Sequence, residues 1–316
     1  MKSIKIILIS ILVGGGNAFA QYAERPKLPS SAIMLGWDND FVFHTDYYYT
    51  NGMSLQFWNN ALQKSPLNYL LIPNNKNQTT VYGISLRQDM FTPVNKTTFA
   101  PQIGDRPYFS YWLLGETKQS YYNDETLVIT SSIYFGLSGE KGGGEWVQNW
   151  IHDLLPNSGH VNGWANQITG SFCLDYQFNL EKQLYRSSHF RLNASAGGLL
   201  GLPYTNIDGK LQFYFGRLGH YPNIFFTLPD KSFQIYGFTV MKAKWVIYNA
   251  SLQGPLFNKP PSDLYLKPLP FVFQAKFGMN IRYKHFTAQV GVDLISPEFS
   301  GARWHRWGAF RFFFIF

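Results

Sequence analysis

Two carboxylates and an amide stand side by side at Asp38, Asn39 and Asp40, in a segment whose flanks alternate like β-strands. If a strand continues through them, Asp38 and Asp40 share one face, because successive side chains alternate along a strand. A β-bulge would instead let Asn39 and Asp40 converge. Such oxygens are ligands that Ca²⁺ prefers, although the spacing does not match an EF-hand loop. A polar barrel interior or a strand-end loop explains the same residues without a metal, so both interpretations stay open.

A hydroxyl residue follows a few positions later, in the run Tyr49-Thr50-Asn51-Gly52. One interpretation is a hydroxyl and exposed backbone next to a polar site. The other is a turn that opens the next strand, because Asn-Gly is a strong turn signal. Taken alone, the run favours the turn.

One segment has helical rather than strand periodicity. After three glycines (142–144), apolar residues recur three and four apart within 145–156, which a proline ends. Gln148 and His152 are four residues apart and therefore share a helix face, with Glu145 one turn earlier. His152 could act as a general base on water. A histidine near a helix C-terminus is also favoured by the helix dipole alone, and the spacing does not decide between these roles.

Signatures of several other enzyme classes are missing from the sequence. Neither Gly-x-Ser-x-Gly nor His-Glu-x-x-His occurs. The glycine run 142–144 is not followed by the Lys-Ser/Thr of a phosphate-binding loop. The single cysteine, Cys173, excludes an intramolecular disulfide and a thiolate zinc site.

The N-terminus has the organisation of a secretory signal peptide. A short basic start is followed by an apolar run over residues 6–13 and by Ala18-Phe19-Ala20, a small-x-small cleavage site. The run is too short for a membrane-spanning helix, which needs about 20 apolar residues. We therefore expect a signal peptide at 1–20 and a mature chain, 21–316, that forms one domain.

The composition and the C-terminal half indicate a transmembrane β-barrel. The chain is 45% hydrophobic and 18% aromatic, yet no second apolar run approaches spanning length. Residues 269–281 have apolar side chains at every odd position and residues 286–294 at every even position, most positions between are polar, and a tight turn separates the two runs. The last strand, 310–316, has phenylalanine at every second position and ends on Phe316. A soluble β-sandwich would expose this strand to aggregation, whereas a bilayer accepts it as a lipid-facing row.

We therefore predict an all-β, antiparallel transmembrane barrel of about 12 strands, with the short helix in an extracellular loop. The net charge of +8 suits a surface of anionic membrane lipids, and the lack of a basic cluster argues against nucleic acid. The terminal phenylalanine resembles the signal for the barrel assembly machinery of bacterial outer membranes. Further strand candidates are 30–41, 50–59, 80–91, 108–117, 125–137, 166–179, 188–199, 208–217, 232–240 and 243–253.

Five stretches, in their order and spacing, resemble the outer-membrane lipid A 3′-O-deacylase family. They span residues 37–164, about the N-terminal half of the mature chain, and the remainder matches only as barrel strands. The stretches are Trp37-Asp38-Asn39-Asp40-Phe41, Asp46-Tyr47-Tyr48-Tyr49-Thr50-Asn51-Gly52, Gln88-Asp89-Met90-Phe91-Thr92-Pro93, Gly104-Asp105-Arg106-Pro107-Tyr108, and Gln148-Asn149-Trp150-Ile151-His152 with Trp164 downstream.

The resemblance implies a Ca²⁺-dependent esterase of the bacterial outer membrane that removes the 3′-linked acyloxyacyl group from lipid A, the anchor of lipopolysaccharide. Its site would lie near the outer leaflet, between the barrel wall and the helix. Position by position, the resemblance gives catalytic roles to Asn39, Asp40, Thr50, Gln148 and His152. Asn39 and Asp40 would also hold Ca²⁺. His152 would take a proton from water, while the metal would polarise the ester carbonyl.

The resemblance also places Lys96 and Arg106 against the anionic head group of lipid A. The chain departs from the family pattern at Ser158, six residues after His152, where the family has Glu. Candidate replacements for that carboxylate are Glu145, Asp153 and Asp38. Second choices within the first acidic segment are Asp38 and Asp46.

Two alternatives to the deacylase stay open. One is an outer-membrane phospholipase with similar ester chemistry. The other is a non-catalytic barrel that serves as a pore or an interaction platform. The acidic group at 38–40, Lys96 and His152 favour the deacylase, whereas Ser158 favours the non-catalytic barrel.

Overall fold

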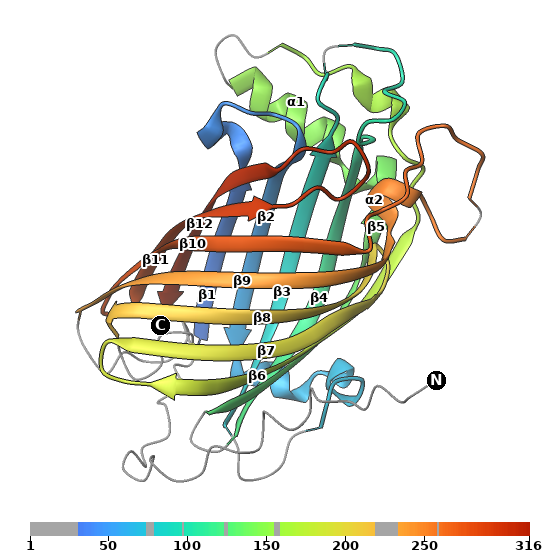
Figure 1. The fold of residues 1–316 in the computed structure, drawn as a ribbon. Helices are drawn as coiled ribbons and strands as arrows, with labels where there is room; N and C mark the ends of the chain where they lie inside the picture. Colours follow the sequence, from blue (N-terminus) through green and yellow to red (C-terminus); the bar gives the residue numbers. More distant parts are fainter. Residues whose placement is uncertain are drawn as a thin grey trace, which may run out of the picture.

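The computed structural model describes residues 31–73, 79–96, 98–122, 126–154, 159–218, 233–257 and 259–316. The expected signal peptide, 1–20, lies outside the described residues and stays a prediction. In the described part of the chain, twelve antiparallel strands form one closed barrel in which β12 returns to pair with β1 (Figure 1). This confirms the predicted fold class. The strands are β1 (Ser31–Asn39), β2 (Tyr48–Asn59), β3 (Thr79–Thr92), β4 (Phe109–Tyr122), β5 (Leu127–Ser138), β6 (Phe172–Arg186), β7 (Phe190–Gly201), β8 (Tyr204–Arg217), β9 (Phe233–Asn249), β10 (Phe271–Tyr283), β11 (Phe286–Ile295) and β12 (His305–Ile315).

The wall alternates apolar side chains outside with polar side chains inside, as a membrane barrel requires. In β10, Phe273 is 58% exposed on the outer face. Lys276 of the same strand turns inward, and its Nζ lies 3.1 Å from Asp293 Oδ2. The hairpin closes between Tyr283 and Phe286, which pair in register. The alternation that predicts these two strands from the sequence is therefore confirmed.

The final strand closes the barrel along its phenylalanine row. Phe310 and Phe312 lie opposite residues of β1, Phe312 facing Leu35. Backbone hydrogen bonds of 2.9 Å run in both directions between Ser31 and Phe316. The two ends of the described chain therefore meet at the same end of the barrel.

The predicted division of one strand into two is wrong. The candidates 232–240 and 243–253 form a single strand, β9, followed by the short helix α2 (Ala250–Gln253). Lys242 lies in the middle of that strand and points into the lumen, where its Nζ is 3.3 Å from Asp208 Oδ2. A charged side chain in mid-strand is therefore accommodated by an inward ion pair and does not interrupt the sheet.

Charged side chains fill much of the lumen and form ion pairs with one another. A cavity of about 330 Å³ lies among them. No helix in the described part of the chain is long and apolar enough to cross a membrane. The luminal ion pairs include Asp38–Arg311, Arg87–Asp89, Lys276–Asp293, Lys242–Asp208 and Arg106–Glu298.

Helices α1 and α2 lie at the barrel end opposite Ser31 and Phe316, where the two ends of the described chain meet (Figure 1). The connection 139–171 holds α1, and barrels of this kind place their longer loops on the extracellular side. We call this end the outer rim. The short helices at this rim, besides α2, are η2 (Asp40–Phe43), η5 (Gly139–Gly142), α1 (Gly144–Leu154) and η6 (Gly163–Asn166), whereas η3 (Asn60–Lys64) and η4 (Pro66–Tyr69) follow β2 at the opposite end.

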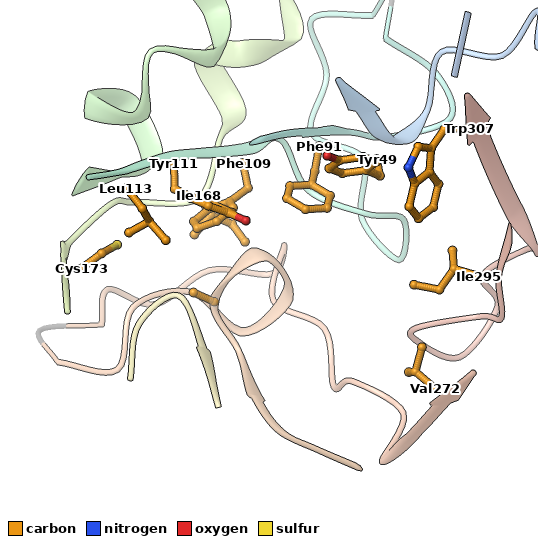
Figure 2. Packing of buried hydrophobic residues seen from close by; sticks show 11 residues of the cluster. Tyr49, Phe91, Phe109, Tyr111, Leu113, Ile168, Cys173, Val272, Ile295 and Trp307 are labelled. Carbon is orange, nitrogen blue, oxygen red and sulfur yellow. The ribbon is translucent and has the colours of Figure 1, made fainter. Parts of the chain in front are cut away.

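A cluster of buried apolar and aromatic side chains lines the inner wall at the outer rim. Figure 2 shows it running from Leu113 past Phe91 and Tyr49 to Trp307. The Tyr49 and Trp307 rings lie 4.7 Å apart, which joins β2 to β12 across β1. This packing fixes the ends of the strands from which the candidate site is built.

Candidate active site

The acidic run at 38–40 straddles the end of a strand. Asn39 is the last residue of β1, and Asp40 begins η2. The Asn39 Oδ1 accepts a hydrogen bond from Phe41 N (2.7 Å), which is an N-cap. The expectation that a strand continues through the run is therefore wrong, because the cap turns the chain. Asp38 points into the lumen, whereas Asp40 lies at the outer rim.

The bulge lies in β2 instead. The residues on either side of Thr50 pair with consecutive residues of β3, so Thr50 has no partner in that strand. A bulge re-aims the side chain, and Thr50 Oγ1 lies 2.5 Å from Asp46 Oδ1 and 3.3 Å from Asp40 Oδ1. Asn51 and Gly52 pair with β1 inside the strand. The turn expected at Asn51-Gly52 is therefore wrong, and Thr50 belongs to the polar group.

Helix α1 is the helix that the sequence predicts, and it buries Gln148 and His152 on one face. Gln148 Oε1 accepts a hydrogen bond from Trp164 Nε1 (2.7 Å), and its Nε2 donates to Asp46 Oδ1 (3.4 Å). His152 Nδ1 lies 2.9 Å from the Gly159 carbonyl oxygen. A carbonyl can only accept, so Nδ1 carries the proton and Nε2 of the neutral ring keeps a free electron pair.

Asp46 joins these segments, although the sequence makes it only a second choice. One of its oxygens lies 3.6 Å from His152 Nε2 and also pairs with Lys96 Nζ. Its other oxygen accepts hydrogen bonds from the side chains of Thr50 and Gln148. In the sequence, only the position of Asp46 shortly before Thr50 indicates that it belongs to the site. Its contact with a helix about a hundred residues later depends on the closed barrel and is not visible in sequence spacing.

Of the two basic residues expected to meet the head group, Lys96 lines the same pocket as His152, and Arg106 does not. Arg106 is 1% exposed. Its guanidinium lies 2.5 Å from Glu298 Oε2, donates to Ser251 Oγ (2.7 Å) and stacks on Phe91 at 4.3 Å. The structure therefore places Arg106 in a buried pairing between distant parts of the chain.

The predicted residues converge on a pocket of about 620 Å³ that also includes Asp46. Met90 lines it too and points outward, because its neighbour Asp89 lines the luminal cavity and side chains alternate. The pocket therefore opens on the outer face of the wall, beneath α1, rather than into the lumen. The predicted residues that line it are Asn39, Asp40, Thr50, Lys96, Gln148 and His152.

The electrostatics of the pocket centre on Asp40, which is 1% exposed. Its hydrogen bonds come from neutral donors, Tyr47 N (3.0 Å) and the Thr50 hydroxyl (3.3 Å). Burial consequently raises the pKa of Asp40 to about 7. Partial burial lowers the pKa of Lys96, and the nearby Asp40 carboxylate opposes that shift.

The donor set suits a hard cation. Asp40, Asp46 and Thr50 offer oxygen ligands, which Ca²⁺ prefers and which transition metals prefer less. The described residues contain no group of three or more His, Cys, Asp or Glu placed to hold a metal. An ion here would therefore complete its coordination with backbone, amide or water oxygens, as Ca²⁺ sites commonly do.

The sequence matches one protein family model, described as outer membrane protein LpxR, over residues 6–316. The chain belongs to the LpxR family. This confirms the resemblance carried by residues 37–164, and it places the barrel in the outer membrane.

LpxR from Salmonella typhimurium has the same fold, with a TM-score of 0.74 at 15% identity, over 90% of this chain and 100% of that chain. Two other barrels align less well. The β domain of the Bordetella autotransporter BrkA has a TM-score of 0.45 at 8% identity (92% and 99% covered). The P. putida toluene transporter TodX has 0.41 at 9% (91% and 90%). A search of curated proteins found no match.

Proposed function

We propose that this LpxR-family protein is an outer-membrane lipid A deacylase that hydrolyses the ester of the 3′-linked acyloxyacyl group. The observation that carries the proposal is the pocket in which the Asp46 carboxylate lies beside both the His152 imidazole, whose Nε2 carries no proton, and the Lys96 ammonium group. Ester hydrolysis needs a base for water and positive charge for the developing oxyanion. A pocket that opens on the outer face of the wall suits a lipid substrate.

His152 is the base in this proposal. The hydrogen bond from Nδ1 to the Gly159 carbonyl fixes the tautomer and the ring orientation. Nε2 accepts a proton from the water that attacks the ester carbonyl carbon, and returns it to the leaving alkoxide when the tetrahedral intermediate collapses. Asp46, with Oδ2 3.6 Å from Nε2, stabilises the imidazolium that exists between these steps.

Asp46 also offers the carboxylate that the family pattern has at position 158. Ser158 itself lies outside the described residues. None of the three carboxylates that the sequence offers in place of that residue lines the pocket. Asp38 is paired with Arg311 in the lumen, and the other two are exposed. The three are Glu145, Asp153 and Asp38.

Lys96 and Gln148 position the substrate in this account. The Lys96 ammonium carries the positive charge of the pocket and would attract the anionic head group of lipid A. Gln148 is held by Trp164, so its amide is fixed in direction before a substrate arrives. Thr50 bridges Asp40 and Asp46, which keeps the two carboxylates close together.

We propose Ca²⁺ as the cofactor, held by Asp40 and Asp46 with help from Thr50 and water. Asn39 stays a prediction as a ligand, because its amide caps η2 and donates to Asn51 Oδ1 (3.1 Å). When bound, Ca²⁺ would polarise the ester carbonyl and offset the negative charge that develops there.

Product analysis tests the activity. We expect purified wild-type protein, incubated with lipid A in detergent, to remove the 3′-acyloxyacyl mass, as measured by mass spectrometry. Intact lipid A accompanied by breakdown of added phospholipid would replace the deacylase with a phospholipase. Intact lipids accompanied by solute leakage from liposomes would indicate a pore instead.

Chelation tests the cofactor. EDTA should abolish hydrolysis in detergent, and Ca²⁺ should restore it better than Mg²⁺, which holds its water more tightly. Asp40→Asn should weaken Ca²⁺ binding in calorimetry, while Asp263→Asn, in an exposed loop at the same barrel end, should not. Full activity in EDTA, or equal Ca²⁺ binding by both variants, would remove Ca²⁺ from the proposal.

A further inference from the structure

Helix α1 lies on the outer face of the barrel wall and not over the lumen. Ser110 of β4 points outward, because its neighbours Phe109 and Tyr111 belong to the inner-wall cluster. The Ser110 Oγ accepts a hydrogen bond from Gly144 N, at the first residue of α1 (3.0 Å). The helix side opposite the pocket therefore faces away from the barrel.

The short helix η2 packs on the same face from the other side of the pocket. The Arg306 guanidinium lies 4.5 Å from the Phe43 ring. Val42 covers Gly308 so closely that a Cβ added there would come within 2.8 Å of it. Arg306 and Gly308 alternate with Trp307, which lines the luminal cavity, so both point outward. The pocket is therefore a lateral recess between η2 and α1.

Both segments carry exposed apolar side chains. On α1, Trp146, Trp150 and Leu154 are one turn apart and 71%, 51% and 65% exposed. The two indoles are stacked, with centroids 6.3 Å apart. On η2, Phe41 and Val42 are 60% and 45% exposed. We call these the α1 face and the η2 tip. Exposed apolar surface of this kind marks an interaction site.

The α1 face continues the lipid-facing wall of the barrel. Trp112 of β4 points outward and donates from Nε1 to the Lys141 carbonyl, shortly before α1 (3.1 Å). Beside it, outward side chains of β3 to β6 form an apolar groove of about 400 Å³. This wall is the membrane interface of an outer-membrane barrel, so the surface next to it meets the same leaflet. The groove is lined by Ile84, Trp112, Leu114, Phe135, Leu137 and Phe172, among others.

We propose that the α1 face and the η2 tip insert into the outer leaflet at its head group–acyl boundary, one on each side of the pocket mouth. Indole rings favour this depth because they are amphipathic. The charged residues Glu145 and Asp153 of α1 are also exposed, as an interfacial helix with a polar edge allows. The ester bonds of a lipid lie at this boundary. The substrate would then enter the pocket sideways without leaving the leaflet. This route of entry rests on the proposed function, whereas the insertion itself does not.

Spin-label accessibility tests the insertion without reference to activity. Nitroxides would be attached at Phe41→Cys, Trp150→Cys and the loop control Asp263→Cys, in a Cys173→Ala background. The vesicles would contain phosphatidylethanolamine, phosphatidylglycerol and lipopolysaccharide. We expect labels at 41 and 150 to collide with oxygen and to be shielded from an aqueous nickel chelate. The label at 263 should instead be accessible to the nickel chelate and collide less with oxygen. Nickel exposure at 41 or 150 equal to that at 263 would overturn the proposal.

Hydrolysis gives an independent second test. Replacing both indoles (Trp146→Ala with Trp150→Ala) should lower the rate on lipid A in vesicles about tenfold, because the mouth loses its depth in the leaflet. The rate on lipid A dispersed in detergent micelles should stay at the wild-type value. An equal loss in both media would overturn the proposal. Inactivity of the wild-type protein in both would refute the deacylase, while the spin labels still decide the insertion.

Discussion

Asp38 and Asp40 are two residues apart and both are buried, yet they belong to different parts of the molecule. Asp38 points into the lumen, where Arg311 lies 2.8 Å away and the Tyr49 hydroxyl donates at 3.1 Å. Asp40 lies in the rim pocket, where its hydrogen bonds come from neutral donors such as Thr50 and burial raises its pKa to about 7. A cation already satisfies the luminal carboxylate, whereas the pocket carboxylate can still take one.

The same contrast holds for the two regions as a whole. Luminal charges form ion pairs between strands, such as Lys276–Asp293, and between connections, such as Arg106–Glu298, which stabilise the closed wall and have no access to lipid. In the pocket, the Asp46 carboxylate is shared among His152, Lys96, Thr50 and Gln148. The lumen therefore serves stability, and the pocket holds charges whose partners can be exchanged for water, substrate or metal.

The largest expected contrast is between Asp46→Asn and Asp38→Asn. Loss of the carboxylate beside His152 should lower the hydrolysis rate about 100-fold, because the imidazolium loses its counter-charge. Asp38→Asn leaves Arg311 in the lumen without its counter-charge, and should destabilise the barrel by about 3 kcal/mol. Rates per folded barrel and urea unfolding in bilayers measure the two effects. Equal loss of activity in both variants would erase the distinction between lumen and pocket.

A second contrast separates the two basic residues. Lys96→Gln should raise the KM for lipid A about tenfold, because one charge-assisted contact is lost. Arg106→Gln should leave KM unchanged and lower the unfolding free energy, because Glu298 loses its buried partner. Steady-state kinetics with urea unfolding separate the cases. A raised KM in Arg106→Gln would return that residue to the substrate site.

The smallest expected effect concerns the bulged hydroxyl. Thr50→Val removes the bridge between Asp40 and Asp46 and should cost about fivefold in rate, the value of one hydrogen bond. Thr50→Ser keeps the hydroxyl and should retain most of the activity, which the same hydrolysis assay reports. If Thr50→Ser were as slow as Thr50→Val, the methyl group and not the hydroxyl would be what matters.

Much of the fold can be predicted from the sequence, because each membrane-spanning strand has its own alternation of apolar and polar residues. The alternation in 269–281 and 286–294 and the phenylalanine row at 310–316 predict β10 to β12, since one face meets lipid and the other meets water. The prediction of two separate strands within β9 was wrong, because Lys242 in mid-strand is neutralised by Asp208 on a neighbouring strand. Such a pairing depends on strand register, which local periodicity does not contain.

Site residues that lie close together in the sequence could be predicted, whereas contacts that only the tertiary fold creates could not. Gln148 and His152 share a face by helix geometry alone. The role of Asp46 appears once the barrel brings β2 beneath α1. Arg106 follows an acidic residue in a loop, which suits a surface role, but it pairs with Glu298, 192 residues later. The Asn51-Gly52 turn signal was overridden because both residues pair with β1.

The most direct test of the central claim compares lipid A from bacteria that express wild-type protein, His152→Ala or His285→Ala. His285 is exposed at the turn between β10 and β11 and is the matched control. Mass spectrometry should show loss of the 3′-acyloxyacyl group with wild type and His285→Ala. It should show intact lipid A with His152→Ala, whose rate is expected to fall about 1,000-fold without its base. Wild-type deacylation by a folded His152→Ala barrel would contradict the account.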